Sequence, residues 1–96
     1  MKVYIAGAIT KNPNYKKQFS EAEENLLNAG HAVINPVKNI GFEYKEYIDM
    51  GLGELMHCDA IYLLNGWESS PGARLEHYYA STVGLKILNE RTANTP

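Results

Sequence analysis

The feature that most constrains this chain is the stretch from residue 58 to residue 84, which reads as a strand, a turn and a helix. Residues 60–64 form an unbroken apolar run. Such a run is typical of a strand that is covered on both faces of a parallel sheet. Asn65 and Gly66 end it, so the sequence predicts a buried strand followed directly by a turn.

The helix that follows carries signals for its start and its end. Ser69 or Ser70 can cap it, and Pro71 suits its first position, where a missing N–H costs nothing. Gly72 has no side chain, so a ligand could approach the backbone closely there. Gly84 is a typical helix terminator, which predicts a helix from Pro71 to Gly84.

Glu76 is the one charged residue on an otherwise apolar stripe of this helix. With about 3.6 residues per turn, it shares a stripe with Ala73, Ala80 and Val83. If the stripe faces the sheet, a carboxylate points inward near the carboxyl end of a central strand, where open α/β sheets bind ligands. Burying an unpartnered carboxylate is costly, which makes Glu76 a functional candidate. The alternative is that Glu76 lies at the edge of the stripe and pairs with Arg74 or with solvent.

The rest of the chain predicts alternating strands and helices. We expect strands at residues 2–6, 32–34 and 85–88, helices at 14–29 and 43–57, and a loop at 37–42. This order predicts an α/β three-layer sandwich with a right-handed parallel sheet of four or five strands, similar to Rossmann and flavodoxin folds. We expect one domain over residues 1–88 and a polar, frayed tail over residues 89–96.

Composition excludes several classes of function. A formal charge of −2 gives no electrostatic case for binding nucleic acid or an anionic membrane. No segment is long enough for a membrane helix or a signal peptide, and the single cysteine fits a reducing cytoplasm, where we place the protein. His31, His57 and His77 share no metal-ligand spacing, and no Gly-rich nucleotide loop is present. We therefore expect no metal and no cofactor.

Ser70, Gly72 and Glu76 form the candidate site, at the start of the helix and facing the end of the first strand. Free N–H groups and a hydroxyl at a helix N-terminus make an anion site suited to phosphate. A carboxylate one turn further in suits a sugar phosphate, with the anomeric carbon near Glu76. A carboxylate can attack an anomeric carbon and form a glycosyl ester, which splits one difficult substitution into two steps.

Four blocks of sequence carry a resemblance: residues 3–9, the corner at 30–36, residues 58–64, and the block Gly-Trp-Glu-x-Ser-x-Gly-Ala-x-x-Glu at 66–76. Over nearly its whole length, to Leu88, the chain resembles a family of small, mostly bacterial and phage proteins of uncharacterised function. That family is similar to the nucleoside 2-deoxyribosyltransferases and the 2′-deoxynucleoside 5′-phosphate N-hydrolases. The last block is specific to the small family, and the link to the enzymes is looser.

The resemblance implies a role for individual residues. Glu76 matches the glutamate that attacks C1′ of the deoxyribose, and Tyr4 matches a first-strand tyrosine that orients it. Ser70 and Gly72 match the segment that binds the 5′-phosphate, and Ala8 and Ile9 match the loop that contacts the sugar. The substrate-binding residues expected on this basis are Gly7, Ala8, Ile9, Trp67, Ser70 and Gly72.

One position departs from the enzymes, which carry an aspartate that assists the leaving base in the helix before the third strand. Counting back from Asp59, the matching position is Gly51. Asp49 is the remaining candidate for the acid, but two positions on a helix are about 200° apart, so it cannot share that face. The chain is also shorter than these enzymes. In that superfamily a neighbouring subunit often completes the site, which implies a homodimer or a larger homo-oligomer.

Three hypotheses follow for function. The first is cleavage of the N-glycosidic bond of a 2′-deoxynucleoside or its 5′-monophosphate, by transfer or by hydrolysis. The second, motivated by Gly51, is a non-catalytic protein that binds or sequesters a nucleotide. The third is a structural domain, in which Glu76 would be exposed and Tyr4 would not reach it. The distance between the Tyr4 hydroxyl and the Glu76 carboxylate separates the third from the others.

Overall fold

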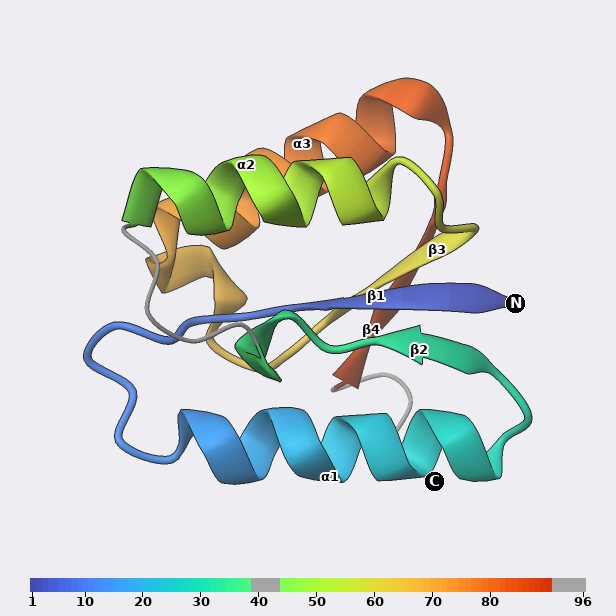
Figure 1. Cartoon of the computed structure of the whole chain (residues 1–96), viewed down its shortest axis with the longest axis horizontal. Coiled ribbons are helices and arrows are strands. Elements are labelled where there is room, and N and C mark those ends of the chain that lie inside the picture. Colours follow the sequence, from blue (N-terminus) through green and yellow to red (C-terminus); the bar gives the residue numbers. More distant parts are fainter. Residues whose placement is uncertain (39–43, 91–96) are drawn as a thin grey trace.

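The computed structural model of the chain describes residues 1–38 and 44–90 and shows a parallel sheet between two layers of helices (Figure 1). The strands are β1 (Lys2–Ala6), β2 (Ala32–Ile34), β3 (Ala60–Leu63) and β4 (Lys86–Asn89). The helices are α1 (Tyr15–Asn28), α2 (Tyr44–Leu55) and α3 (Pro71–Val83), with 3₁₀ turns η1 (Pro36–Lys38) and η2 (Trp67–Ser69). This confirms the predicted α/β three-layer fold, with four strands.

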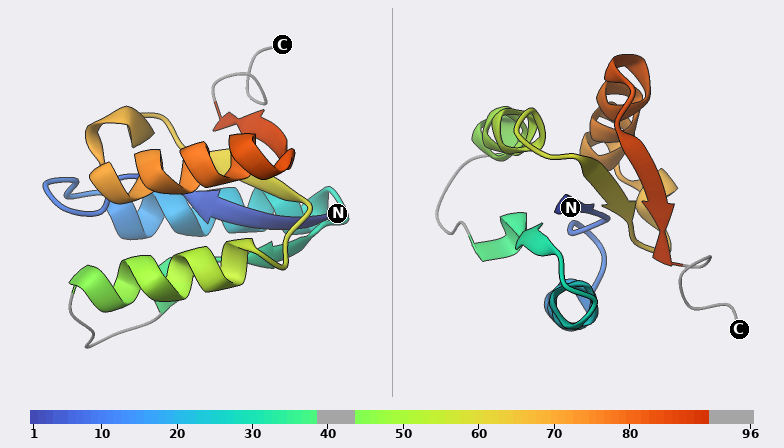
Figure 2. Two further views of the ribbon diagram at one scale, coloured as in Figure 1. Left: turned by 90° about the horizontal axis from the view of Figure 1, so that it is seen from above. Right: turned by 90° about the vertical axis from the view of Figure 1, so that its right-hand side faces the viewer.

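The strand order is β2-β1-β3-β4, and every neighbouring pair is parallel. β1 is therefore a central strand, and its Tyr4 lies opposite Ile34 of β2 and Ile61 of β3. The helix α1 covers one face of the sheet, whereas α2 and α3 cover the other (Figure 2). The carboxyl end of β1 thus opens between α1 and the start of α3.

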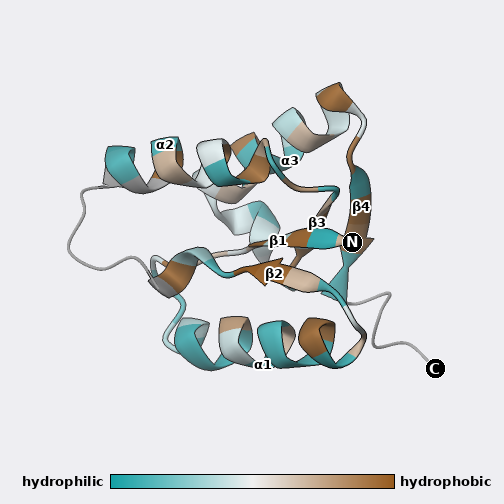
Figure 3. Cartoon of the chain, turned by 45° about the vertical axis from the view of Figure 1, so that its right-hand side comes forward, coloured by the Kyte–Doolittle hydropathy of each residue, from teal (hydrophilic) through white to brown (hydrophobic). Residues whose placement is uncertain are grey.

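Side chains alternate along β1 between the two faces. Val3 and Ile5 pack against the α1 layer, where Phe19 of α1 is buried. Tyr4 and Ala6 pack in the layer of α2 and α3. Figure 3 shows the apolar residues of α1 separated by hydrophilic ones, as expected of a helix with one face on the sheet.

The boundaries of α3 follow the predicted signals. The hydroxyl of Ser70 accepts a hydrogen bond from the backbone N–H of Ala73 at 3.2 Å, and Pro71 occupies the first helical position. Gly84 ends the helix with φ of 82°, in the left-handed region that a residue without a Cβ adopts easily. Strand β4 runs one residue beyond its predicted end, because Asn89 pairs with Leu63.

Two other predicted segments differ from the structure or fall partly outside it. Residues 36–38 form the turn η1, where the sequence predicted a loop from residue 37, and the rest of that loop lies outside the described residues. The first residue of the predicted tail is part of β4, and Glu90 accepts hydrogen bonds from Asn65 N at 2.8 Å and Gln18 Nε2 at 3.2 Å. Residues 91–96 lie outside the described part, so the domain boundary at residue 88 stays a prediction.

Candidate active site

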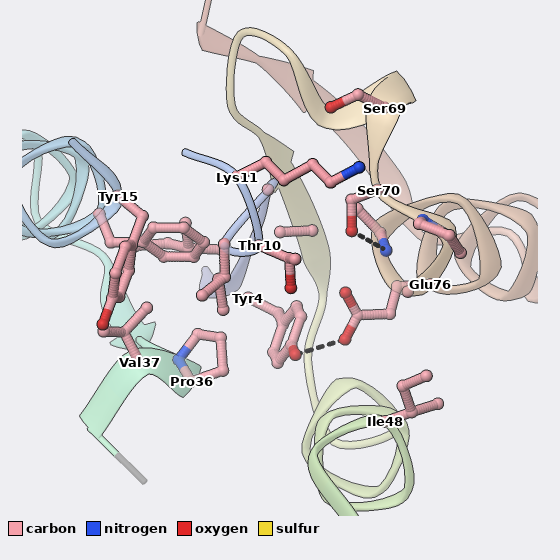
Figure 4. A pocket seen from close by; sticks show the side chains of 18 residues that line it. Tyr4, Thr10, Lys11, Tyr15, Pro36, Val37, Ile48, Ser69, Ser70 and Glu76 are labelled. Atoms are coloured by element: carbon pink, nitrogen blue, oxygen red, sulfur yellow. Dashed lines mark hydrogen bonds between the residues drawn. The ribbon is translucent and has the colours of Figure 1, made fainter. Parts of the chain in front are cut away.

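A pocket of about 620 Å³ opens where β1 ends (Figure 4). Its walls come from the segment after β1, from η1, from the start of α3 and from α2. This is the edge of the sheet at which parallel α/β folds bind ligands, because the connections that leave the strands there diverge. The pocket lies in the region that the sequence predicted for the site.

Tyr4 and Glu76 meet at the wall of this pocket. The Tyr4 hydroxyl donates a hydrogen bond to Oε2 of Glu76 at 2.5 Å, across 72 residues of sequence. Glu76 is 8% exposed and Tyr4 is 1% exposed, so the inward orientation of the Glu76 stripe is correct and its edge alternative is wrong. Val83, at the last position of that stripe, is 52% exposed. The structural-domain hypothesis loses its basis, since it required an exposed Glu76 beyond the reach of Tyr4.

The environment of Glu76 favours its neutral form. Burial raises the pKa of its carboxyl from 4.5 to about 7, because the charged form loses its hydration. The hydrogen bond from Tyr4 lowers this pKa, and the nearby negative charge of Glu54 raises it. Burial and the Glu76 charge also raise the pKa of the Tyr4 hydroxyl, so Tyr4 stays a hydrogen-bond donor. A carboxylate with a pKa near neutrality is a common mark of a functional site.

Glu54 is a second acidic residue in this environment, which the sequence analysis did not single out. Its Oε1 is buried and has no hydrogen-bond partner within the described part of the chain. Its charge raises the pKa of both Tyr4 and Glu76, which places it near the pair. It lies three residues after Gly51, so both are on one face of α2. That spacing is the signal that could have identified it.

One side of the pocket is polar. Ser69, Ser70 and Gly72 line it at the start of α3, together with Lys11 from the segment after β1. The Ser70 hydroxyl accepts the capping bond, which leaves its own proton to donate to a ligand. Lys11 has a φ of 64°, rare for a residue with a side chain, and Figure 4 shows its ammonium group on the same side of the pocket as Ser70. An anion would find a cation, a hydroxyl and helix N–H groups here.

The opposite side of the pocket is apolar. Figure 4 places Tyr15, Pro36 and Val37 across the pocket from Ser70, with Tyr4 between the two sides and Glu76 extending toward Tyr4 from the side of Ser70. Ile48 lines the pocket from α2. A flat aromatic group would fit against such side chains, close to the carboxyl group of Glu76.

The predicted site residues divide into two groups. Those that line the pocket are Tyr4, Gly7, Ile9, Ser70, Gly72 and Glu76. Ala8 and Trp67 are not among the lining residues, so their role in substrate binding stays a prediction. The Ala8 carbonyl instead accepts a hydrogen bond from Asn12 Nδ2 at 2.9 Å, and the Trp67 ring packs against His77 with ring centroids 4.6 Å apart.

The acid proposed from the sequence, Asp49, has an exposed side chain and does not line the pocket. The reason is the helical geometry: Gly51, two residues later, is the position that faces Tyr4 and Glu76. Sequence reasoning missed several residues that line the pocket, namely Lys11, Tyr15, Pro36, Val37 and Ile48. It also missed Glu54, which does not line the pocket but whose charge acts on Tyr4 and Glu76. Among the described residues, no cluster of three or more His, Cys, Asp or Glu side chains could hold a metal ion, and no helix has the length and apolar character needed to cross a membrane.

Comparisons with known proteins agree with this fold. The model of the family described as domain of unknown function DUF4406 matches residues 1–89. The structure of the Clostridium botulinum CMP N-glycosidase BcmB is 22% identical with a TM-score of 0.68, and the match covers 93% of this chain and 70% of that one. No curated protein matches the chain in sequence.

A second solved structure is the 2-desoxiribosyltransferase from Leishmania mexicana, at 22% identity and a TM-score of 0.73. The match covers 92% of this chain but only 62% of that one, so the chain spans less than two thirds of the transferase. At this level of identity the two structures show a shared fold. They confirm the resemblance that the four sequence blocks predicted.

Proposed function

We propose that this chain, which belongs to the DUF4406 family, cleaves the N-glycosidic bond of a 2′-deoxynucleoside or its 5′-monophosphate. The observation that carries the proposal is the buried Glu76 carboxylate, held by Tyr4 at the wall of the pocket. The two solved neighbours carry the names of an N-glycosidase and a 2-desoxiribosyltransferase, which supports this class of reaction.

The two sides of the pocket suggest how the substrate lies. A 5′-phosphate would bind between Lys11, Ser70 and the first N–H groups of α3. The base would pack against Tyr15, Pro36 and Val37 on the apolar side. The sugar would then lie between them with C1′ toward the carboxyl group of Glu76 at the wall of the pocket. This pose favours the monophosphate over the free nucleoside.

Glu76 acts as the nucleophile in the first step. Its Oε2 accepts the bond from Tyr4, which leaves Oε1 to attack C1′ of the sugar. A C1′–O bond forms as the C1′–N bond breaks, and the base leaves with the electron pair and takes a proton. In the second step water attacks C1′, the ester C–O bond breaks, the carboxylate is regenerated and a proton is released. Attack by another base in place of water gives transfer.

Mass spectrometry of the intact protein tests this mechanism. We expect a covalent adduct on Glu76 after incubation with a 2-fluoro analogue of a deoxynucleoside monophosphate, and release of free base from the natural nucleotide. Glu76→Gln should form no adduct and lose turnover by about 10³-fold or more. Glu68→Gln is the matched control, since Glu68 is an exposed glutamate beside the same helix. No adduct together with equal turnover of both variants would exclude this mechanism.

The second hypothesis, a protein that binds or sequesters a nucleotide without cleaving it, is favoured by Gly51. At the position where the similar enzymes carry the acid for the leaving base, this chain has no side chain. Calorimetry that shows tight binding of a deoxynucleotide, with no free base after prolonged incubation, would support it over catalysis. Binding of no nucleotide at all would contradict both hypotheses.

A further inference from the structure

Gly51 lies in the middle of α2 and is buried directly against the Tyr4–Glu76 pair. A Cβ atom built on Gly51 would lie 2.5 Å from the Tyr4 hydroxyl oxygen and 2.6 Å from Oε2 of Glu76. Real Cβ atoms essentially never lie closer than 3.0 Å to a heavy atom of a residue that is not a chain neighbour. The pair therefore occupies the space that any side chain at position 51 would need.

Neither of these two oxygen atoms can move away at little cost. The two atoms are hydrogen-bonded to each other, and both residues are almost fully buried. Tyr4 is in the central strand β1, and Glu76 is on the buried side of α3. The other glycine of α2, Gly53, has open space where its Cβ would be. Both glycines weaken the helix by the same backbone effect, but only Gly51 is in contact with the pair.

Close packing of α2 against the pair also limits which side chains of α2 can reach a substrate in the pocket. Among the α2 side chains that the structure describes, Ile48 lines the pocket, whereas Asp49 is exposed and Glu54 does not line it. A side chain at position 51 would have to displace Tyr4 or Glu76 to reach the pocket. With α2 packed as it is in this structure, the pair leaves no room for an acidic side chain at position 51.

We propose that Gly51 is a positioning residue, which seats the Tyr4–Glu76 pair on the backbone of α2 and so leaves the departing base without a proton donor from position 51. The second part rests on the proposed function and deepens it. A base that leaves without such help carries the electron pair of the C1′–N bond as developing negative charge. The preferred substrates are then nucleotides whose base is stable as an anion.

A mutant cycle tests the seat itself and does not depend on activity. Gly51→Ala and Gly53→Ala are each introduced into the wild type and into Tyr4→Phe/Glu76→Ala, which lacks both contacting atoms. In the wild type, Gly51→Ala should lower the denaturant midpoint and Gly53→Ala should not. In the second background, both changes should leave the midpoint unchanged or raise it, because alanine favours helix. If Gly51→Ala does not fold in the wild type and folds in the second background, this also supports the seat. An equal loss of midpoint in both backgrounds would overturn it.

Kinetics test the consequence for the leaving base. Turnover is measured with deoxynucleoside monophosphates whose bases differ in acidity. Without a proton donor, kcat should fall about tenfold for each unit by which the pKa of the leaving base rises. A nearly flat dependence would overturn the absence of an acid. Gly51→Ala should lower kcat by about tenfold or more with KM little changed, and Gly53→Ala should change neither.

The two failures are distinguishable. If no deoxynucleotide is turned over by the wild type, the proposed function fails, and with it the part of the inference that concerns the leaving base. The mutant cycle still decides whether Gly51 seats the pair, because it reads the stability of the fold. If turnover is observed with a flat dependence on the leaving base, the function stands and the inference about the base is wrong.

Discussion

The two faces of the sheet are built from the same strands but differ in what they bury. On the α1 face the core cluster contains no charged side chain, with Val3, Ile5, Phe19 and Tyr62 among its members. On the face covered by α2 and α3, the cluster surrounds Tyr4, and the buried carboxylate Glu76 lies beside it. One helix covers the first face, whereas two helices meet over the second (Figure 2).

This difference places the titrating carboxyl of the site on one face, although Ile5 and Phe19 of the α1 face also line the pocket. Burial of an ionisable group opposes folding, so it has to be offset by apolar burial elsewhere. The α1 face supplies such burial and contains no group that titrates near neutrality among its core members. Changes on the α1 face should therefore alter stability, and changes on the other face should alter stability and pH dependence together.

The largest effect is expected on the α1 face. Phe19→Ala removes a fully buried aromatic ring and should lower the free energy of unfolding by about 3–5 kcal/mol. Denaturant unfolding measures this change, with the exposed neighbour Ser20→Ala as control. The pH at which activity is half-maximal should not move in the fraction that remains folded. A shift of this pH would contradict the separation of the two faces.

Glu76→Gln should stabilise the protein at pH 8. The pKa of Glu76 is about 7 in the folded protein and 4.5 without burial, so the folded state binds more protons between these values. Its contribution to stability is therefore greatest below pH 4.5 and is lost as the pH rises through 7. Glutamine does not ionise, so the variant should gain about 3 kcal/mol over the wild type at pH 8. Unfolding curves at pH 4 and pH 8 measure the gap, which should close at pH 4.

Tyr4→Phe should shift the pH dependence of activity upward. The hydrogen bond from Tyr4 lowers the pKa of Glu76, so its loss moves the acid limb of the rate profile to higher pH. A hydrogen bond to a charged group is worth about 1.5–3 kcal/mol, which corresponds to about a 10- to 150-fold loss of rate. Tyr62→Phe, which removes a hydroxyl on the opposite face, is the control. An acid limb that stays in place would mean that Tyr4 does not act on the ionisation of Glu76.

Glu54→Gln should produce the smallest effect and one of opposite sign. Removing this negative charge lowers the pKa of Glu76, because Glu54 is the like charge that raises it. The acid limb should therefore move to lower pH, with little change in the maximal rate. Asp49→Asn removes an exposed charge from the same helix and should leave the profile unchanged. A profile that moves equally in both variants would point to a general effect of charge.

Much of the fold could be predicted from local patterns. The apolar run at residues 60–64, the cap at Ser70 and the stop at Gly84 each act over a few residues, so the sequence displays them directly. The stripe of Ala73, Glu76 and Ala80 allowed an inward Glu76 but left an edge position open, and the structure decided between them because all three residues are buried. The pairing of Tyr4 with Glu76 came from the resemblance alone, since no periodicity relates two residues 72 positions apart.

The rest of the site depends on how the elements are placed. Lys11 lines the pocket from a backbone conformation with φ of 64°, which its sequence context did not indicate. Ala8 and Trp67 share a segment with residues that line the pocket, but their side chains pack elsewhere. The effect of Glu54 on the pKa of Tyr4 and Glu76 depends on its proximity to them, and this proximity arises only from the packing of α2 against the pair.

By itself the sequence determined the order of the strands and helices, and it offered the inward direction of Glu76 as one of two alternatives. These follow from short-range periodicity and from residues that start or end a helix. Only the tertiary structure decided that α2 lies against Tyr4 and Glu76 with no side chain between them at Gly51. It also decided that the pKa of Glu76 rises to about 7, because hydration is lost only when distant segments close around the carboxyl group.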